Sequence, residues 1–435
     1  MVTLKYFKII IFSGILLSAV ACSKPVPTND TSATVYVKNT ENGFQLIRNQ
    51  EVFQIKGAAG NSHLAELKAA GGNTIRVYDT INLKQILDNA HEEGLAAIVD
   101  IPLPKYGDGS HFYENDLGPA KKKISKLVMK FRDHPALLYW NLGNEIYYPT
   151  FHKNITFFKS YNELVKLVRE TDPNHPVSTA VIGGNRRRLA SILLRSPDLD
   201  LISINSFGSL TSLEERMKPF LYVWNGPYVI TEWGVNGPWE EEATSWGAPI
   251  QNTSSKTAEI LEDRYNSEVM KHKNCLGSIV FFWGNKQERT NTWFSIFSEE
   301  GYKSESFHKL NELWTGNSGN YDGPEINYAY LNGNGGPSNI ILPAGGLAKA
   351  EVFLQKGQDR SLRYNWEIRP EAWYKIEEQQ PVLKGLIPEN NKDKISFKAP
   401  LKEGPYRLFV YAIDKENNFS TTNIPFYVLN PANEE

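Results

Sequence analysis

The sequence predicts an α/β protein, a (β/α)8 TIM barrel followed by a C-terminal immunoglobulin-like β-sandwich. Eight apolar, strand-like runs recur between residues 53 and 283, and segments with helical periodicity separate them. Strands that are apolar on both faces and alternate with helices are typical of a parallel sheet. Eight such units in about 265 residues match the usual size of a closed barrel. An open doubly wound sheet is the alternative, but it usually has fewer strands, and no Gly-rich phosphate-binding motif follows the first run.

The predicted barrel elements follow one another in regular order. Ahead of them, strand-like pieces within residues 34–56 predict a small hairpin that closes the bottom of the barrel. The eight strands are predicted at 53–58, 73–78, 95–101, 136–142, 176–181, 200–205, 227–233 and 277–283. The clearest helices are predicted at 81–93, 116–133, 151–172, 209–224, 254–273 and 304–313. The barrel domain, with its hairpin, is therefore expected to span residues 34–315.

A second domain is predicted after a Gly/Asn-rich linker at residues 316–323. Within residues 324–435, short alternating runs are separated by turn residues, as in an antiparallel β-sandwich of roughly 100 residues. Trp366 and Trp373 make a carbohydrate-binding module one interpretation of this domain. Both positions also suit a sandwich core, so a structural or spacer domain is favoured.

The first 21 residues have the pattern of a secretory signal peptide, in which a basic start precedes an apolar run and small residues. The run is too short to span a bilayer comfortably, which takes roughly 20 residues. Cys22 directly follows Ala21, as in a bacterial lipobox. We therefore expect a lipoprotein whose lipidated Cys22 anchors it in the membrane of the cell envelope, on either side of the outer membrane, through a tether at residues 22–33. Ordinary secretion with cleavage near Cys22 is the alternative.

Composition excludes several classes of partner. The chain has 47 basic and 49 acidic residues, a formal net charge of −2, so nothing indicates binding to nucleic acid. Its two cysteines, Cys22 and Cys275, belong to no Cys/His ligand cluster. We therefore expect no metal and no cofactor, and a monomer is the expected state.

The reacting groups of a (β/α)8 barrel come from the C-terminal ends of its strands. Several polar residues stand there, and the pair that matters is Glu145 after the fourth strand and Glu232 in the seventh. Glycoside cleavage needs such a pair, one carboxyl protonated to assist the leaving oxygen and one ionised to attack the anomeric carbon. We expect Arg76 to hold Glu232 ionised while burial raises the pKa of Glu145. The alternative is that each carboxylate only forms a salt bridge with an arginine such as Arg76.

The motifs around these residues resemble those of clan A glycoside hydrolases. YWNLGNE (139–145) and ITEWG (230–234) are closest to the catalytic domain of glycoside hydrolase family 2, and IKGAAG, GGNTIRVYD and FFWGN agree in position and order. The chain also resembles compact bacterial β-glucanases built from a barrel and an immunoglobulin-like domain. The resemblance implies that Glu145 is the acid/base, Glu232 the nucleophile, and Arg76 its support. It also implies that Asn144 binds the sugar 2-hydroxyl and that Trp283 forms the platform beneath the sugar.

Two features depart from this pattern. Strand 6 reads Asn205-Ser206-Phe207, where relatives usually place a Tyr whose phenol contacts the nucleophile; Asn205 or a loop residue is expected to substitute. The sandwich domains that precede the barrel in typical family 2 enzymes are absent. Tyr147 and Trp239 stand on loops of the catalytic face and are candidate sugar platforms, although loop anchoring is an equally good interpretation.

The predicted function is a retaining β-glycoside hydrolase that acts on a polysaccharide, with a β-glucan, β-1,3-linked in the first instance, as the expected substrate. A transglycosylase that uses the same covalent intermediate is one alternative. A catalytically silent, glycan-binding surface lipoprotein is the other. Retention of both Glu145 and Glu232 beside Asn144 favours an enzyme, because a binding protein needs no matched acid and nucleophile.

Overall fold

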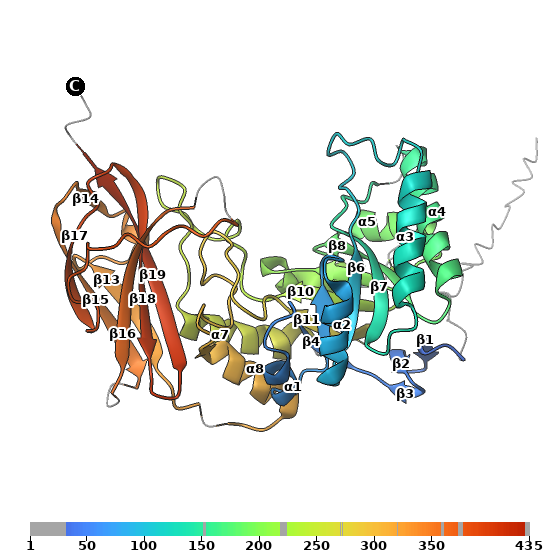
Figure 1. Ribbon diagram of the computed structural model, residues 1–435, viewed down its shortest axis with the longest axis horizontal. Coiled ribbons are helices and arrows are strands. Elements are labelled where there is room, and N and C mark those ends of the chain that lie inside the picture. Colours follow the sequence, from blue (N-terminus) through green and yellow to red (C-terminus); the bar gives the residue numbers. More distant parts are fainter. Residues whose placement is uncertain are drawn as a thin grey trace, which may run out of the picture.

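The computed structural model describes residues 32–150, 154–217, 224–269, 271, 273–319, 321–357, 361–372 and 377–430. A barrel with its helices forms the right-hand part of the molecule in Figure 1, and a β-sandwich forms the left-hand part. The predicted signal peptide, Cys22 and most of the predicted tether lie outside the described residues. Among those that are described, no helix has the length and apolar character needed to cross a membrane.

The barrel is a closed ring of eight parallel strands, in the order β10-β11-β4-β5-β6-β7-β8-β9. This confirms the predicted fold class. Each strand is buried at every residue or at all but one, which explains why the strands are apolar on both faces. Their bounds are β4 (Ile55–Ala59), β5 (Thr74–Val77), β6 (Ala96–Ile101), β7 (Leu137–Asn144), β8 (Val177–Ile182), β9 (Ile202–Asn205), β10 (Tyr228–Trp233) and β11 (Cys275–Val280).

Helices surround the barrel and bury one face each. In α2, for example, Leu83, Leu87 and Ala90 are buried at helical spacing. The predicted helix at 209–224 is instead a short 3-10 turn followed by α6, and residues 218–223 lie outside the described part. The helices are α1 (Leu64–Ala69), α2 (Leu83–Glu92), α3 (Gly118–Phe131), α4 (Ile155–Thr171), α5 (Arg186–Arg195), η1 (Gly208–Ser212), α6 (Leu213–Met217), α7 (Ser254–Arg264), the π-helical η2 (Tyr265–Val269) and α8 (Glu305–Thr315).

A small antiparallel sheet closes the bottom of the barrel. It consists of β1 (Val35–Thr40), β2 (Gly43–Arg48) and β3 (Glu51–Val52). Its apolar side packs onto strand residues of the barrel, including Ile98 and Leu138. Gly43 has a φ of 113°, and a Cβ there would lie 2.3 Å from the carbonyl oxygen of Lys273, so the turn requires glycine.

The C-terminal domain is a sandwich of two sheets. One sheet has the order β13-β15-β17, and the other has β12-β19-β18-β16 with β14 paired to β19. The sandwich is confirmed, while its likeness to immunoglobulin domains remains a prediction. Trp366 is buried in the core between the sheets, and Trp373 lies outside the described residues. The strands are β12 (Lys303–Ser304), β13 (Glu325–Leu331), β14 (Ile341–Pro343), β15 (Leu347–Lys356), β16 (Arg363–Pro370), β17 (Lys394–Lys398), β18 (Gly404–Ile413) and β19 (Asn418–Leu429).

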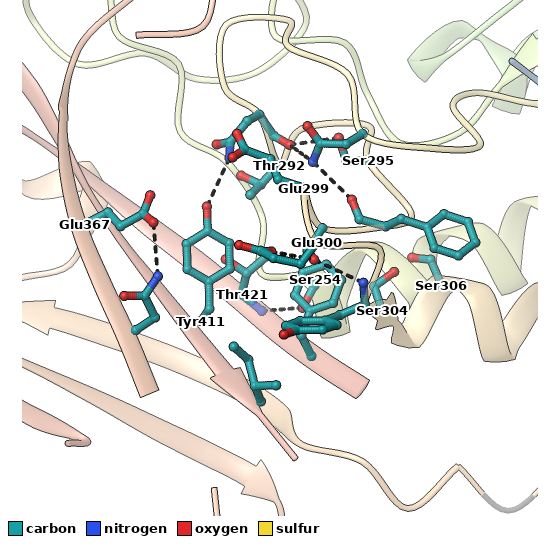
Figure 2. Close-up of a pocket in the computed structure, with 18 of the residues that line it drawn as sticks. Ser254, Thr292, Ser295, Glu299, Glu300, Ser304, Ser306, Glu367, Tyr411 and Thr421 are labelled. Carbon is teal, nitrogen blue, oxygen red and sulfur yellow. Dashed lines mark hydrogen bonds between the residues drawn. The ribbon is translucent and has the colours of Figure 1, made fainter. Parts of the chain in front are cut away.

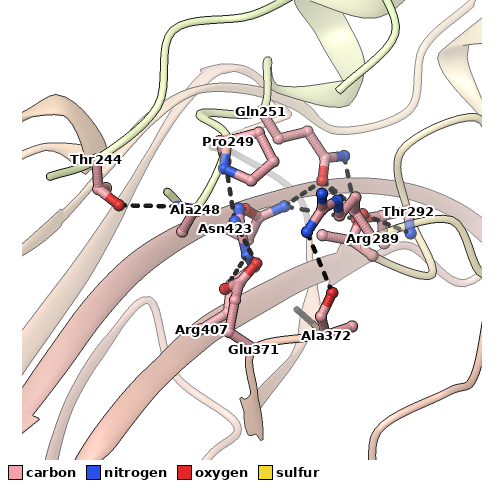
Figure 3. A network of polar contacts seen from close by, with 11 residues as sticks. Thr244, Ala248, Pro249, Gln251, Arg289, Thr292, Glu371, Ala372, Arg407 and Asn423 are labelled. Carbon is pink, nitrogen blue, oxygen red and sulfur yellow. Dashed lines mark hydrogen bonds and ion pairs between the residues drawn. The ribbon is translucent and has the colours of Figure 1, made fainter. Parts of the chain in front are cut away.

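The sheet that contains β18 and β19 docks on the barrel through buried polar contacts. Arg407 pairs with Glu371 at 2.8 Å, and its guanidinium also donates to Asn423 and to the backbone carbonyl of Pro249 on the β10–α7 loop (Figure 3). Beside this network, barrel loops and sandwich strands together enclose a polar cavity of about 40 Å³, lined by Glu299 and Tyr411 among others (Figure 2). The β10–α7 and β11–α8 loops are therefore held against the sandwich.

Candidate active site

Five barrel strands bring polar side chains to one place at their C-terminal ends. Such groups are costly to bury unless they are hydrogen-bonded or paired. The residues are Arg76 on β5, Asp100 on β6, Asn144 and Glu145 at the end of β7, Asn205 on β9 and Glu232 on β10.

Arg76 is the centre of this cluster and is fully buried. Its guanidinium binds the Asp100 carboxylate through two hydrogen bonds, of 3.1 and 2.8 Å, and pairs with Glu232 at 2.9 Å. It also donates to the side-chain oxygens of Asn144 and Asn205. Burial opposes the charge of Arg76, but the surrounding groups, Asp100 first and also Glu232, outweigh that cost and raise its pKa. The guanidinium is therefore a fixed positive charge at the base of the site.

Asn205 joins the two glutamates. Its Nδ2 donates to Glu145 Oε1 and to Asn144 Oδ1, both at 3.0 Å. Its Oδ1 accepts from Arg76, which itself contacts Glu232. Glu145 and Glu232 are thus linked through only two side chains, although 87 residues separate them in the sequence.

The two carboxyl groups have different surroundings. Glu232 is 7% exposed, and burial, aided by the charge of Glu145, raises its pKa to about 7, although Arg76 and Tyr78 oppose the rise. Glu145 is only half-buried. Glu232 is therefore more deeply buried than Glu145, because β10 runs through the barrel wall whereas Glu145 lies just beyond β7. A carboxylate inside the wall loses more hydration than one at the rim.

The chain turns sharply where Glu145 leaves the strand. Gly143 has a φ of 83°, and the non-glycine residues Glu145 and Tyr147 have φ values of 51° and 55°. A side-chain-bearing residue rarely adopts this left-handed conformation, and such outliers cluster at functional sites. The turn places Tyr147 on the surface, 45% exposed, with the Lys105 ammonium 5.0 Å from its ring centre.

Tyr78 is a member of the cluster that sequence reasoning missed. Arg76 stacks over its ring at 4.6 Å, and its phenol contacts Glu232 and lowers the pKa of that carboxyl. The hydroxyl is buried but makes no hydrogen bond of normal geometry. Because Arg76 and Tyr78 are two residues apart on one strand, their side chains share a face, and this spacing could have revealed Tyr78. Asn205 or a loop residue was expected to replace the Tyr that relatives carry after strand 6, and the phenol near Glu232 belongs to Tyr78, directly after β5.

Trp283 is not the platform that was expected. It is 1% exposed, donates from Nε1 to the His63 carbonyl at 3.0 Å, and packs against Trp314 of α8 and Phe297. It is a core residue because the ring turns outward to fill the space between barrel and helix. Phe281, directly after β11, is the half-buried aromatic residue on the site side, where it meets Tyr78 edge-on.

Aromatic rings continue from the carboxylates to the surface. Phe281 contacts Phe207 and Phe294, at ring separations of 5.6 and 5.1 Å, and Trp239 packs edge-on against Phe207 at 5.8 Å. Trp239 is 63% exposed. This row, Tyr78, Phe281, Phe207 and Trp239, is called the aromatic wall below. Within the described part of the chain, no cluster of three or more His, Cys, Asp or Glu residues has the geometry to hold a metal ion.

No protein-family model and no curated protein sequence matches this chain significantly. Solved structures with a similar fold include a GH2 β-galacturonidase of Eisenbergiella tayi bound to galacturonate, with a TM-score of 0.50 and 17% identity over 66% of this chain and 55% of that one. A β-glucuronidase of Bacteroides uniformis has a TM-score of 0.48 and 13% identity over 91% of this chain and 48% of that one. An endo-β-1,4-mannanase of Thermotoga petrophila has a TM-score of 0.42 and 13% identity over 88% of this chain and 99% of that one.

These similarities concern the fold, since the identities are below one fifth. This chain spans about half the length of the glucuronidase and galacturonidase chains. The residues that would carry chemistry must therefore be judged from this chain's own geometry.

Proposed function

We propose that the protein is a retaining β-glycoside hydrolase, with Glu145 as acid/base and Glu232 as nucleophile. One observation carries the proposal: two carboxyl groups from β7 and β10 meet at a single Arg76–Asn205 cluster, at the strand ends where this fold places catalytic groups. Glu232 contacts a fixed cation, which favours its ionised form. Among the described residues, the Glu145 carboxylate accepts a hydrogen bond from the neutral amide of Asn205 and lies nearer to solvent, as a group that exchanges protons with water must.

The reaction proceeds in two displacements. In the first, Glu232 attacks the anomeric carbon, the glycosidic bond breaks, and the leaving oxygen takes the proton of Glu145. In the second, Glu145 removes a proton from water, and the resulting hydroxide displaces Glu232 from the sugar. Because each step inverts the anomeric carbon, the product retains the β configuration.

Asn144 is oriented for the sugar 2-hydroxyl by the same network. Its Oδ1 accepts from both Arg76 and Asn205, so the amide can face only one way. Its Nδ2 has no hydrogen-bond partner among the described residues and is free to donate to the substrate. A bond to the 2-hydroxyl that tightens in the transition state would contribute to rate.

The proposed substrate is a β-linked polysaccharide, with a β-glucan as the first candidate. The aromatic wall supports a carbohydrate, since aromatic rings stack on the apolar faces of sugars. Trp239 and Tyr147, both exposed, are the proposed binding residues at the edge of the site. The β-glucan itself rests on the resemblance to compact glucanases. Anchoring in the cell envelope through lipidated Cys22 is a further part of the proposal, and loss of fatty-acid labelling in Cys22→Ser tests it.

The experiment is to incubate the protein with a panel of β-linked polysaccharides and oligosaccharides and to measure new reducing ends. We expect turnover on at least one β-glucan, and a loss of about 10³-fold or more in both Glu145→Gln and Glu232→Gln. Azide should restore turnover to Glu145→Ala and give a β-glycosyl azide, because it replaces water in the second displacement without needing a base. Tight retention of one polysaccharide without any cleavage would instead establish a binding protein.

A further inference from the structure

The sandwich has two outer faces, and among the described residues the barrel loops cover one of them. The face of the β16–β18–β19 sheet carries Phe409, Tyr411 and Phe419, which are at most 8% exposed because the barrel loops pack on them. Figures 2 and 3 show this contact. The β13–β15–β17 sheet lies on the side away from the barrel (Figure 1). Its outer face therefore faces solvent, and the side chains there can contact a ligand.

Aromatic side chains gather on this open face. Tyr328 and Tyr330 of β13 are 39% and 38% exposed, while their neighbours Ala329 and Leu331 point into the core. Phe353 of β15 lies opposite Tyr328 in the register, and their ring centres are 4.7 Å apart. Exposed aromatic groups that cluster are uncommon on a surface that only meets water and mark a site of contact.

A hollow of about 770 Å³ adjoins the rings on the same face. Tyr330 forms one side, the strand residues Lys349 and Ser396 lie in it, and Asn332 borders it. The Ser396 hydroxyl, the Asn332 Nδ2 and the Lys349 ammonium make no hydrogen bond with any other described side chain. The size is that of a ligand site, and the lining combines an aromatic ring with several free hydrogen-bonding groups.

The charge of this face is positive once ion pairs are counted. Glu351 pairs with Lys394 and Glu389 with Lys392, so both acidic residues of the hollow are neutralised. Lys349 in the hollow and Lys398, exposed at the far end of β17, have no acidic partner in the described part of the chain. The uncompensated charge is therefore cationic and complements an anion.

We propose that the outer face of the β13–β15–β17 sheet binds a polysaccharide chain that bears carboxylate groups. The sugar faces stack on Tyr328 and Tyr330, hydroxyls reach Ser396 and Asn332, and carboxylates face Lys349 and Lys398. This site lies on the opposite side of the sandwich from the barrel, so it does not depend on the proposed hydrolysis. A chain held here stays near the protein and raises the local concentration of polymer at the barrel.

The test compares the affinity of the full chain for a C6-oxidised β-glucan with its affinity for the neutral parent polymer of the same length. Both are measured in the Glu232→Gln variant, which prevents turnover. We expect binding of the oxidised polymer that weakens with salt. The Tyr328→Ala/Tyr330→Ala variant should weaken it by about fivefold per ring removed. Lys349→Gln/Lys398→Gln should abolish the preference for the oxidised polymer. Ile341→Ala, exposed on β14 of the other sheet, is the matched control and should bind normally.

Three outcomes would overturn the proposal. They are equal binding of the neutral polymer, unchanged affinity in the double tyrosine variant, and a dimer in sedimentation that the tyrosine variant dissociates. Since the residues substituted on this face are exposed, the melting temperatures of these variants should equal that of the Glu232→Gln background, which would exclude misfolding as the cause. If the protein cleaves no β-linked saccharide in the reducing-end assay, the proposed hydrolase function fails, but the binding measured here would still stand.

Discussion

Replacing Tyr78 with Phe removes one buried oxygen from the site and leaves its ring in place. The ring keeps its stacking with the Arg76 guanidinium, at 4.6 Å, and its contact with Phe281. Only the contact between the phenol and the Glu232 carboxylate is lost, and that contact favours the ionised form. The variant therefore isolates one influence on the proposed nucleophile.

The size of the effect follows from the energy of that contact. A hydrogen bond to a charged group contributes about 1.5–3 kcal/mol; the phenol contacts Glu232 without a hydrogen bond of normal geometry, so we take the lower end. One pKa unit corresponds to about 1.4 kcal/mol, so the pKa of Glu232 should rise by about one unit above its value of about 7. At pH 6 the ionised fraction, and with it kcat/KM, should fall about tenfold. At pH 9 the loss should be much smaller.

The assay is kcat/KM for a small aryl β-glycoside between pH 5 and 9. Its acid limb should rise with pH around pH 7 in the wild type and shift upward in Tyr78→Phe. Tyr161→Phe is the control, because Tyr161 is a buried barrel tyrosine that donates to the Leu142 carbonyl and not to a carboxylate. An acid limb that does not move, whatever the change in kcat, would refute the role of the phenol.

Three further predictions concern the barrel and its interface. Arg76→Met should lower the free energy of unfolding in urea by about 3–5 kcal/mol at pH 7, because it leaves Asp100 and Glu232 as buried charges without their partner; a loss below 1 kcal/mol would contradict this. Trp283→Ala should cost about 3–5 kcal/mol of stability with little change in kcat/KM, whereas Phe281→Ala should lower kcat/KM roughly fivefold to tenfold; the reverse pattern would restore Trp283 as the platform. Burial raises the pKa of Glu305 from 4.5 to about 7. The wild type should therefore lose up to about 3 kcal/mol of unfolding free energy relative to Glu305→Gln as the pH rises from 4.5 to above 7, measured by parallel urea titrations. A difference between the two proteins that stays constant with pH would show that Glu305 does not titrate in this window.

The barrel was predictable because its sequence signals are repeated. Each strand from β4 to β11 is an apolar run, and each is followed by a segment with helical spacing or turn residues. The end of β9 was less regular, because the chain between Phe207 and residue 217 forms a 3-10 turn and only one short helix. The prediction of one continuous helix from residue 209 therefore missed the 3-10 turn, and residues 218–223 lie outside the described part.

The meeting of Glu145, Glu232 and Arg76 was predictable for a topological reason. In a parallel barrel the C-terminal ends of all strands lie on the same rim, so polar side chains at these ends come close to one another. Which of these side chains form hydrogen bonds with one another was not predictable. The sequence suggested Arg76 for Glu232, but it did not indicate that Asp100 takes two of the hydrogen bonds of the guanidinium.

Trp283 shows where such reasoning fails. Three aromatic residues, Phe281, Phe282 and Trp283, follow β11, and the sequence does not state which ring faces the site. The backbone decides, since the amide of Phe281 bonds to Trp233 on β10 and that of Trp283 to Ala59 on β4. The two residues thus join neighbours on opposite sides of β11. The largest ring then fills the gap in front of α8, where its burial stabilises the fold most.

The sandwich connects to the site through the loops that carry the aromatic wall. Trp239 stands on the β10–α7 loop, and the same loop carries Pro249 and Gln251, which accept hydrogen bonds from Arg407 and Asn423 of the sandwich. Phe294, which packs against Phe281, stands on the β11–α8 loop beside Asn291, whose side chain contacts Tyr411. Loops of this length are ordinarily the mobile parts of a barrel. Buried polar contacts fix a geometry more strictly than apolar contacts do, because a displaced polar group loses its hydrogen-bond partner. The sandwich therefore stabilises the position of the loops that carry Trp239 and Phe294, even though none of its strands reaches the carboxylates.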